Sequence, residues 1–194
     1  MRWLVVAIAI TVAAPAHADS GYYFSEALGG GDYDGQLGRY GGAPRFELRF
    51  GMRRNAISVE LTGTFMIPDF YYIDCYGEEC AYAARPQAGL GAAGVEIRQR
   101  WRLLSLKRVG RPGVYERPGL FVSLHGGMKW WGGSEAIEGY GGPGVTGGVS
   151  LEGDLWILGY FADLGLDVLH LEGPGETIRG SIPYVVFGAK FGWL

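Results

Sequence analysis

The dominant pattern in the sequence is an alternation of apolar and polar residues with a period of two. Between Arg45 and Phe50, for example, every second residue is apolar and those between are charged. Successive side chains of a β-strand point to opposite faces, so such a segment has one greasy and one polar face. No window sustains the i, i+3, i+4, i+7 spacing of an amphipathic helix. The chain is therefore predicted to be all-β.

The alternation recurs often enough to predict eight antiparallel strands. They lie near residues 22–30, 45–50, 57–65, 95–103, 120–130, 145–152, 156–168 and 184–193. The phase of the first strand is not fixed by its sequence. An even strand number is typical of single-chain bacterial outer-membrane barrels.

The predicted connections alternate in length, as in outer-membrane barrels with short periplasmic turns and longer extracellular loops. Tight turns are expected at 52–55 and 153–154. Longer loops are expected at 31–42, 66–85, 131–144 and 171–176. A basic connection containing Lys107, Arg108, Arg111 and Pro112 breaks this alternation, because it should be periplasmic but is not short.

The charged residues indicate which face of each strand points into the lumen. A lipid-facing arginine at the bilayer midplane costs roughly 2–4 kcal/mol, so Arg98, Arg100 and Arg102 are expected in the lumen or outside the hydrocarbon. Both signs of charge occur on the polar faces, which suits a narrow lumen of paired side chains. The aromatic residues Trp101, Trp130, Trp156, Tyr160 and Trp193 fall on the apolar face, mostly toward strand ends, as expected for interfacial rings. The alternative is a soluble secreted barrel with its charged face in water.

The first eighteen residues have the features of a secretory signal peptide. Arg2 precedes an apolar run from Leu4 to Ala14, and Ala16-His17-Ala18 has the small-x-small pattern of a cleavage site. The apolar run is shorter than the roughly 20 residues of a membrane-spanning helix, which disfavours the alternative of an anchor. We expect residues 1–18 to be removed and residues 19–194 to form one barrel domain.

Composition excludes several classes of function. The 35 glycines among 194 residues follow no G-x-y period, which excludes collagen. A formal net charge of −3 with mixed signs predicts no nucleic-acid surface. The glycine-rich runs do not lie between a strand and a helix, so no nucleotide cofactor is expected.

Cys75 and Cys80 lie close together in an acidic, tyrosine-rich segment. An exported chain meets an oxidising compartment, so a local disulfide is expected. Closing so short a loop stabilises the fold by only roughly 2 kcal/mol. Free or intermolecular thiols are one alternative, and a metal site is disfavoured because no histidine is near.

The glycine-rich strand PGLFVSLHGGMKWW and the closing strand YVVFGAKFGWL resemble those of small eight-stranded outer-membrane barrels of the OmpA and opacity-protein type. The resemblance covers the whole mature chain. It implies an up-and-down transmembrane barrel closed between its first and last strands, with both termini in the periplasm. It also implies delivery by the barrel assembly machinery and contact with outer-membrane lipids and lipopolysaccharide. One departure is Leu194, which follows Trp193 where such chains often end on an aromatic residue.

Few residues suggest chemistry. Ser123 and His125 share a face, and some barrels of this size are lipid A deacylases, but the order is reversed relative to that family's His-x-Ser. The phase places both in the lumen, where a polar pair without catalysis is expected. His170 is expected in a loop, and residues 31–35 are expected to form a turn rather than a calcium site. No catalytic, cofactor or metal site is predicted, and the protein is not expected to be an enzyme.

The sequence therefore predicts an outer-membrane barrel with a structural or surface-interaction role carried by its extracellular loops, above all 66–85. A narrow channel or carrier of small apolar molecules is the alternative, and it would need an open lumen.

Overall fold

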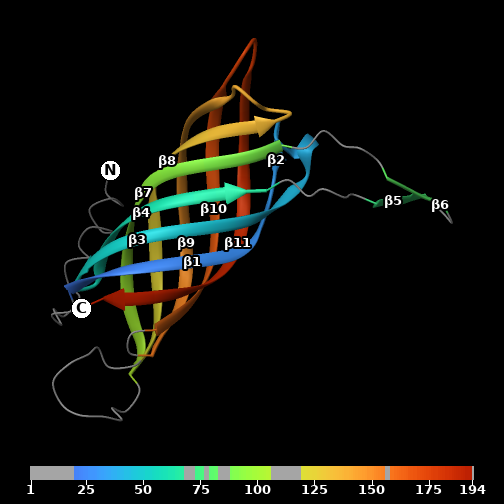
Figure 1. Cartoon of the computed structure of the whole chain (residues 1–194). Coiled ribbons are helices and arrows are strands. Elements are labelled where there is room, and N and C mark those ends of the chain that lie inside the picture. The colour runs from blue at the N-terminus through green and yellow to red at the C-terminus, as the bar shows by residue number, and fades with distance from the viewer. Residues whose placement is uncertain are drawn as a thin grey trace, which may run out of the picture.

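The structure, a computed structural model, describes residues 20–67, 73–76, 79–82, 88–105, 119–155 and 158–193. Nearly all of these residues lie in strands, as Figure 1 shows. The strands and one short 3₁₀ helix are β1 (Ser20–Asp32), β2 (Asp34–Gly35), η1 (Gly38–Tyr40), β3 (Gly42–Arg54), β4 (Ile57–Met66), β5 (Ile73–Tyr76), β6 (Glu79–Tyr82), β7 (Ala88–Ser105), β8 (Gly119–Glu135), β9 (Gly141–Leu155), β10 (Leu158–Glu172) and β11 (Thr177–Trp193).

Eight of these strands form a closed antiparallel barrel. Their order is β1-β3-β4-β7-β8-β9-β10-β11, so each strand pairs with its neighbour in the chain, and β1 also pairs with β11. The closing seam runs from Tyr22 opposite Trp193 to Gly31 opposite Tyr184. Beyond it, β2 pairs with Gly180 and Ser181 of β11. The predicted eight-stranded up-and-down barrel is confirmed.

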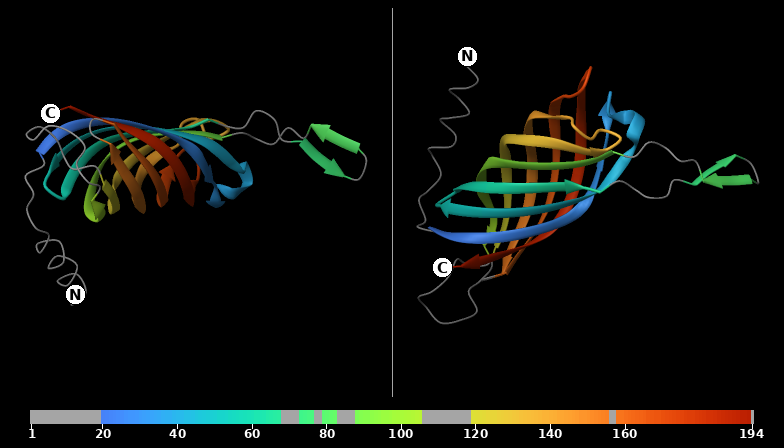
Figure 2. Two further views of the ribbon diagram at one scale, coloured as in Figure 1. Left: turned by 90° about the horizontal axis from the view of Figure 1, so that it is seen from below. Right: turned by 45° about the horizontal axis from the view of Figure 1, so that its top comes forward.

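The two ends of the barrel differ (Figures 1 and 2). One end carries the start of β1 and the finish of β11, which lie side by side. We call this the terminal end. The other end, the loop end, carries β2, η1 and the turns between β8 and β9 and between β10 and β11. On the described chain, no helix has the length and hydropathy that a bilayer-spanning helix requires.

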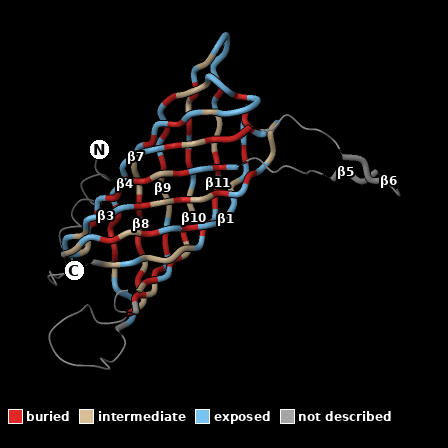
Figure 3. Tube along the Cα trace, viewed as in Figure 1, coloured by how far each residue is buried: buried red, intermediate tan, exposed pale blue. Residues whose placement is uncertain are grey.

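Burial alternates along each strand as the sequence pattern predicts (Figure 3). In β4, Glu60 and Thr62 are buried, whereas Val59 and Leu61 between them are exposed. The same alternation fixes the phase of β1, which the sequence left open: Tyr23, Ser25 and Ala27 point inward, and Tyr22 and Leu28 point outward.

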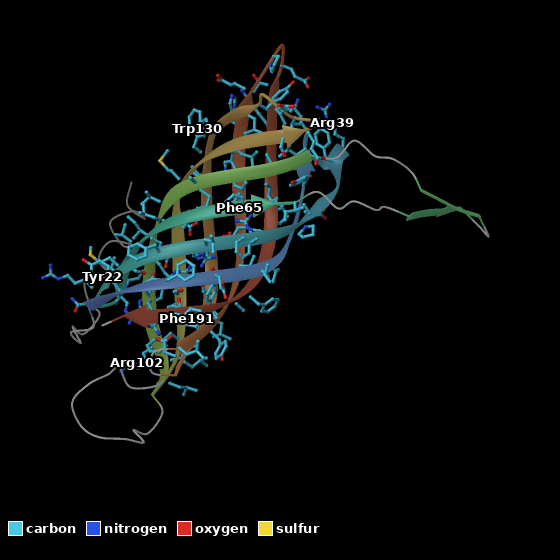
Figure 4. The ribbon with its side chains drawn as sticks, viewed as in Figure 1. Tyr22, Arg39, Phe65, Arg102, Trp130 and Phe191 are labelled. Atoms are coloured by element: carbon cyan, nitrogen blue, oxygen red, sulfur yellow. The ribbon has the colours of Figure 1, made fainter. Side chains whose placement is uncertain are left out.

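The outer surface of the barrel is apolar. Leu28, Met128 and Trp130 are each 66% exposed and Phe187 is 64% exposed, while charged residues are buried inside. A soluble barrel has the opposite arrangement, so this alternative is wrong. Figure 4 shows Tyr22 and Phe191 toward the terminal end and Trp130 toward the loop end, as expected for rings at two membrane interfaces.

Glu26 is an exception on this apolar surface. It lies midway along β1, opposite Leu48 of β3 on one side and Ala189 of β11 on the other. Its side chain is exposed, in phase with Tyr22 and Leu28.

Several boundaries differ from the sequence predictions. The turn after Arg54 is tight as expected, with Asn55 at φ 58°. By contrast, Gly153 and Asp154 are not a turn but part of β9, because Asp154 is a buried ion-pair partner of Arg100. The expected loop 131–144 is also shorter, since β8 continues to Glu135 and β9 begins at Gly141.

Arg102 lies near the end of β7 and is exposed, as the expected position in the lumen or outside the hydrocarbon allows. It lies opposite the buried Phe121 of β8, and its guanidinium carbon is 5.2 Å from the centre of that ring; the register shifts only beyond it, between Arg102 and Leu104. Arg98 and Arg100 precede the shift and are buried as predicted. The proposed signal peptide 1–18, Trp156 and the basic stretch around Lys107 lie outside the described residues.

Leu164→Arg should test the outward face of the barrel. Leu164 is 58% exposed and lies between Val149 and Val185, so the arginine would face hydrocarbon. We expect unfolding in lipid vesicles to become easier by about 2–4 kcal/mol. Leu164→Phe is the matched control and should change stability little; equal stabilities of the two variants would contradict a lipid-facing position.

Candidate functional site

The middle of the lumen is filled by an ionic belt contributed by all eight barrel strands. Its buried members are Arg45, Glu47, Arg49, Ser58, Glu60, Glu96, Arg98, Arg100, Ser123, Lys129, Ser150, Glu152, Asp154, Asp163 and Asp167, together with Ser25 of β1 and the half-buried Lys190 of β11. They share the inward phase of their strands. Because the surrounding wall is apolar on its outside, charges here are far from bulk water and are stable only when paired.

Arg98 is the centre of this belt. Its guanidinium lies 3.0 Å from Glu60 of β4, 3.1 Å from Asp163 of β10 and 3.4 Å from Glu152 of β9. It also donates hydrogen bonds to the hydroxyls of Ser123 and Ser150. One side chain therefore connects four other strands across the lumen.

Further pairs extend the network toward the loop end. Arg45 lies 2.6 Å from Asp167, and Arg49 lies 2.6 Å from Asp163. Both arginines also pair with Glu47, which lies between them on β3. The Lys129 ammonium lies 3.0 Å from Glu96 and 3.6 Å from Asp167.

Pairs toward the terminal end close the lumen below Arg98. Lys190 donates a hydrogen bond of 2.6 Å to Glu152. Arg100 pairs with Asp154, and its guanidinium carbon lies 3.4 Å from the centre of the Phe121 ring. The predicted lumen of paired charges is thus confirmed for these residues.

An apolar plug lies inside the barrel at the loop end. It consists of the buried residues Tyr33, Leu37, Ala43, Met66, Ala88, Leu90, Ala92, Trp131, Ile137, Leu169, Leu171, Ile178 and Ile182. Trp131, Leu37, Ile137 and Leu171 are fully buried. The Tyr33 hydroxyl ties the plug to the wall by donating a hydrogen bond of 3.0 Å to the Ala88 carbonyl. The plug was not predicted from the sequence, although apolar residues inside the glycine-rich loops were a signal for it.

Ser123 and His125 both point into the lumen and are buried, as predicted. Their partners differ. The Ser123 hydroxyl donates a hydrogen bond of 2.6 Å to Glu152, while His125 Nε2 lies 3.0 Å from the Tyr184 hydroxyl. The two side chains are therefore held in separate contacts, and no nucleophile–base pair is formed between them.

The remaining motifs occupy structural positions. His170 lies within β10 rather than in a loop, with Nε2 3.7 Å from Glu172. In the segment 31–35, the Asp34 carboxylate accepts a hydrogen bond of 2.7 Å from the Gly35 amide. Across the described residues, no group of three or more potential metal ligands occurs.

At the loop end, side chains from three loops meet on the surface. Arg39 of η1 lies 3.2 Å from Glu176, in the β10–β11 turn, and Tyr140 of the β8–β9 turn donates a hydrogen bond of 3.5 Å to the same carboxylate. The Arg39 guanidinium also lies over the Tyr40 ring. Partial desolvation and the Glu176 carboxylate raise the pKa of the Tyr140 phenol. This loop cluster presents aromatic and charged groups suited to contact with a partner.

Cys75 and Cys80 lie directly opposite each other in the β5–β6 hairpin. Their side chains lie outside the described part of the chain. The register is one in which neighbouring strands bring Cβ atoms within reach of a disulfide, so the bond stays a prediction that this hairpin favours.

The fold has a counterpart among solved structures. The structure aligns with Neisserial surface protein A (NspA) with a TM-score of 0.59 and 13% sequence identity, covering 90% of this chain and 98% of that one. A major outer membrane protein from Thermus thermophilus and the N-terminal barrel domain of Pseudomonas aeruginosa OprF align at lower TM-scores of 0.41 and 0.37, with 13% and 15% identity. These cover 89% and 90% of this chain and 99% and 100% of theirs.

No family model matches the sequence, and no curated protein matches it significantly. The closed eight-stranded barrel and its alignment with NspA confirm, at the level of the fold, the predicted resemblance to small eight-stranded outer-membrane barrels.

Arg98→Met should reveal how much the barrel depends on its belt. Removal of the guanidinium leaves Glu60 and Asp163 buried with one partner fewer, and breaking a buried pair in this way costs about 3–5 kcal/mol. Urea unfolding in lipid vesicles measures the loss. Arg54→Met, at an exposed position, is the control; a loss for Arg98→Met no larger than for this control would show that the belt contributes little.

Proposed function

We propose that the protein is a non-conducting barrel of the outer membrane, with a structural or surface-interaction role carried by its loop end. The observation that supports this most strongly is the content of the barrel. Paired charges fill its middle, and the apolar plug fills its mouth. A channel or a carrier of small molecules needs an open lumen, so the interior disfavours that alternative.

The location follows from the outer surface. Exposed aliphatic and aromatic side chains surround the barrel and end in aromatic residues near both rims. This is the surface that hydrocarbon stabilises, and closed barrels of this type are those of outer membranes. We place the loop end outside the cell and the terminal end in the periplasm. Export by the segment 1–18 and insertion by the barrel assembly machinery complete the proposed route.

The surface role rests on the loop cluster and on the hairpin β5–β6. Arg39, Tyr40, Tyr140 and Glu176 form an exposed or half-buried group of aromatic and charged side chains. Residues of these types are enriched in protein–protein contacts. The barrel holds the loops in place, and no catalytic step is part of the proposal.

Conductance in planar bilayers tests the closed lumen. We expect the folded protein to give no steady conductance, because the plug and the belt leave charged solutes no continuous wet path. Folding is verified first by the difference in gel migration with and without boiling. Steady, single-step currents from the folded protein would overturn the proposal in favour of a narrow channel.

The state of the cysteines is tested separately. Intact protein exposed to an alkylating agent without reductant should gain no mass, and after reduction it should gain the mass of two labels on Cys75 and Cys80. Cys75→Ser/Cys80→Ser should fold into the same heat-shifted barrel, since a small loop closure stabilises by only roughly 2 kcal/mol. Labelling of the unreduced protein would contradict the disulfide.

A further inference from the structure

A hollow lies on the outside of the barrel near the loop end. It measures about 790 Å³ and crosses β8, β9, β10, β11 and β2. Its apolar lining includes Met128, Val145, Leu166 and Val168, all on the outward face. The hollow is thus a recess in the apolar outer wall.

The plug lies directly behind the hollow. Gly144 and Gly180, which line the hollow from behind, have no side chain on their inner face. A Cβ at Gly144 would lie 2.7 Å from Trp131 Nε1, and one at Gly180 would lie 2.8 Å from Leu37 Cδ1. These glycines let the strands lie directly against the plug.

A basic group lies on the rim of the hollow. Arg179 of β11 is exposed, and within the described chain its side chain has no ion pair or hydrogen bond. His170 lies opposite it on β10. Trp130, which pairs with Pro143 of the hollow's lining, is exposed on the outer face at the same end. An outward tryptophan is typical of the membrane interface, so the rim lies at headgroup level and the apolar lining lies below it.

We propose that this hollow binds a phosphorylated, multiply acylated glycolipid of the outer leaflet, lipopolysaccharide, through its lipid A part. The acyl chains would cover the apolar lining, and Arg179 would bind a lipid A phosphate, because a guanidinium presents a planar fork of donors that matches phosphate oxygens. The inference deepens the proposed function and rests on its orientation, since only the outer leaflet carries this lipid.

The width of the hollow favours this lipid over a two-chain phospholipid. It extends over five neighbouring strands, which at about 4.8 Å per spacing is roughly 19 Å along the wall. That width suits several chains side by side. Two carboxylates also lie near the rim. The Asp34 carboxylate accepts a hydrogen bond from the Gly35 amide, and the Glu172 carboxylate lies 3.7 Å from His170 Nε2. Their negative charges would repel a phosphate at other positions on the rim. The proposed phosphate contact therefore depends on Arg179.

Native mass spectrometry of the folded protein in detergent tests the proposal. The probes are hexa-acylated bisphosphorylated lipid A, the same lipid without phosphates, and phosphatidylglycerol. We expect R179Q to weaken lipid A binding by about tenfold to a hundredfold, the range of one hydrogen bond to a charged group. R179K should retain part of the affinity. Val168→Trp, which fills the hollow, should weaken binding of all three lipids.

R54Q is the matched control, because Arg54 is exposed at the terminal end and away from the hollow. Equal lipid A binding by R179Q and by the unchanged protein would overturn the proposal, as would binding of phosphatidylglycerol as tight as that of lipid A. Membrane fractionation and the heat shift of R179Q are measured in parallel. If both are normal while lipid A binding is indifferent to Arg179, this inference fails alone; if the unchanged protein is not found in the outer membrane, the proposed function fails.

Discussion

The pairing of charges inside an apolar wall is the interaction on which this barrel depends. Each arginine of the belt is held by carboxylates from other strands, and Arg98 alone reaches β4, β9 and β10. An unpaired charge in such a place would cost several kcal/mol, so removal of either partner would destabilise the barrel. The same network makes the lumen a solid core. In the closed barrel that we propose, the loop end and the outer wall are the surfaces that can contact other molecules.

The ion pairs also affect how the barrel assembles. Arg45 and Asp167, or Arg49 and Asp163, are more than a hundred residues apart in sequence and meet only when β3 and β10 face each other across the lumen. A partly formed sheet would therefore hold its charges without their partners. Hydrogen bonds of β1 with β11 remove the last open edges at the same step. Closure of the seam and neutralisation of the lumen are thus coupled.

The sequence predicted the fold and the phase of most strands, because hydrocarbon outside and charge inside impose a period of two. It failed where another interaction overrides that period. The ion pair with Arg100 keeps Asp154 in a strand where Gly153 suggested a turn. The plug was missed because Leu37 and Ile137 lie in loops, where no strand phase indicates that they fold back. The hollow lies over the plug and was not predicted for the same reason.

Glu26 places a carboxyl group on one side of the outer face. At this depth the described outer face is otherwise apolar, and the carboxyl group, midway along β1 between Leu48 and Ala189, marks the side of the barrel at the closing seam. The barrel is therefore asymmetric within the plane of the bilayer. A neighbouring molecule that contacts this side of the barrel meets a carboxyl group where the adjoining positions present apolar side chains.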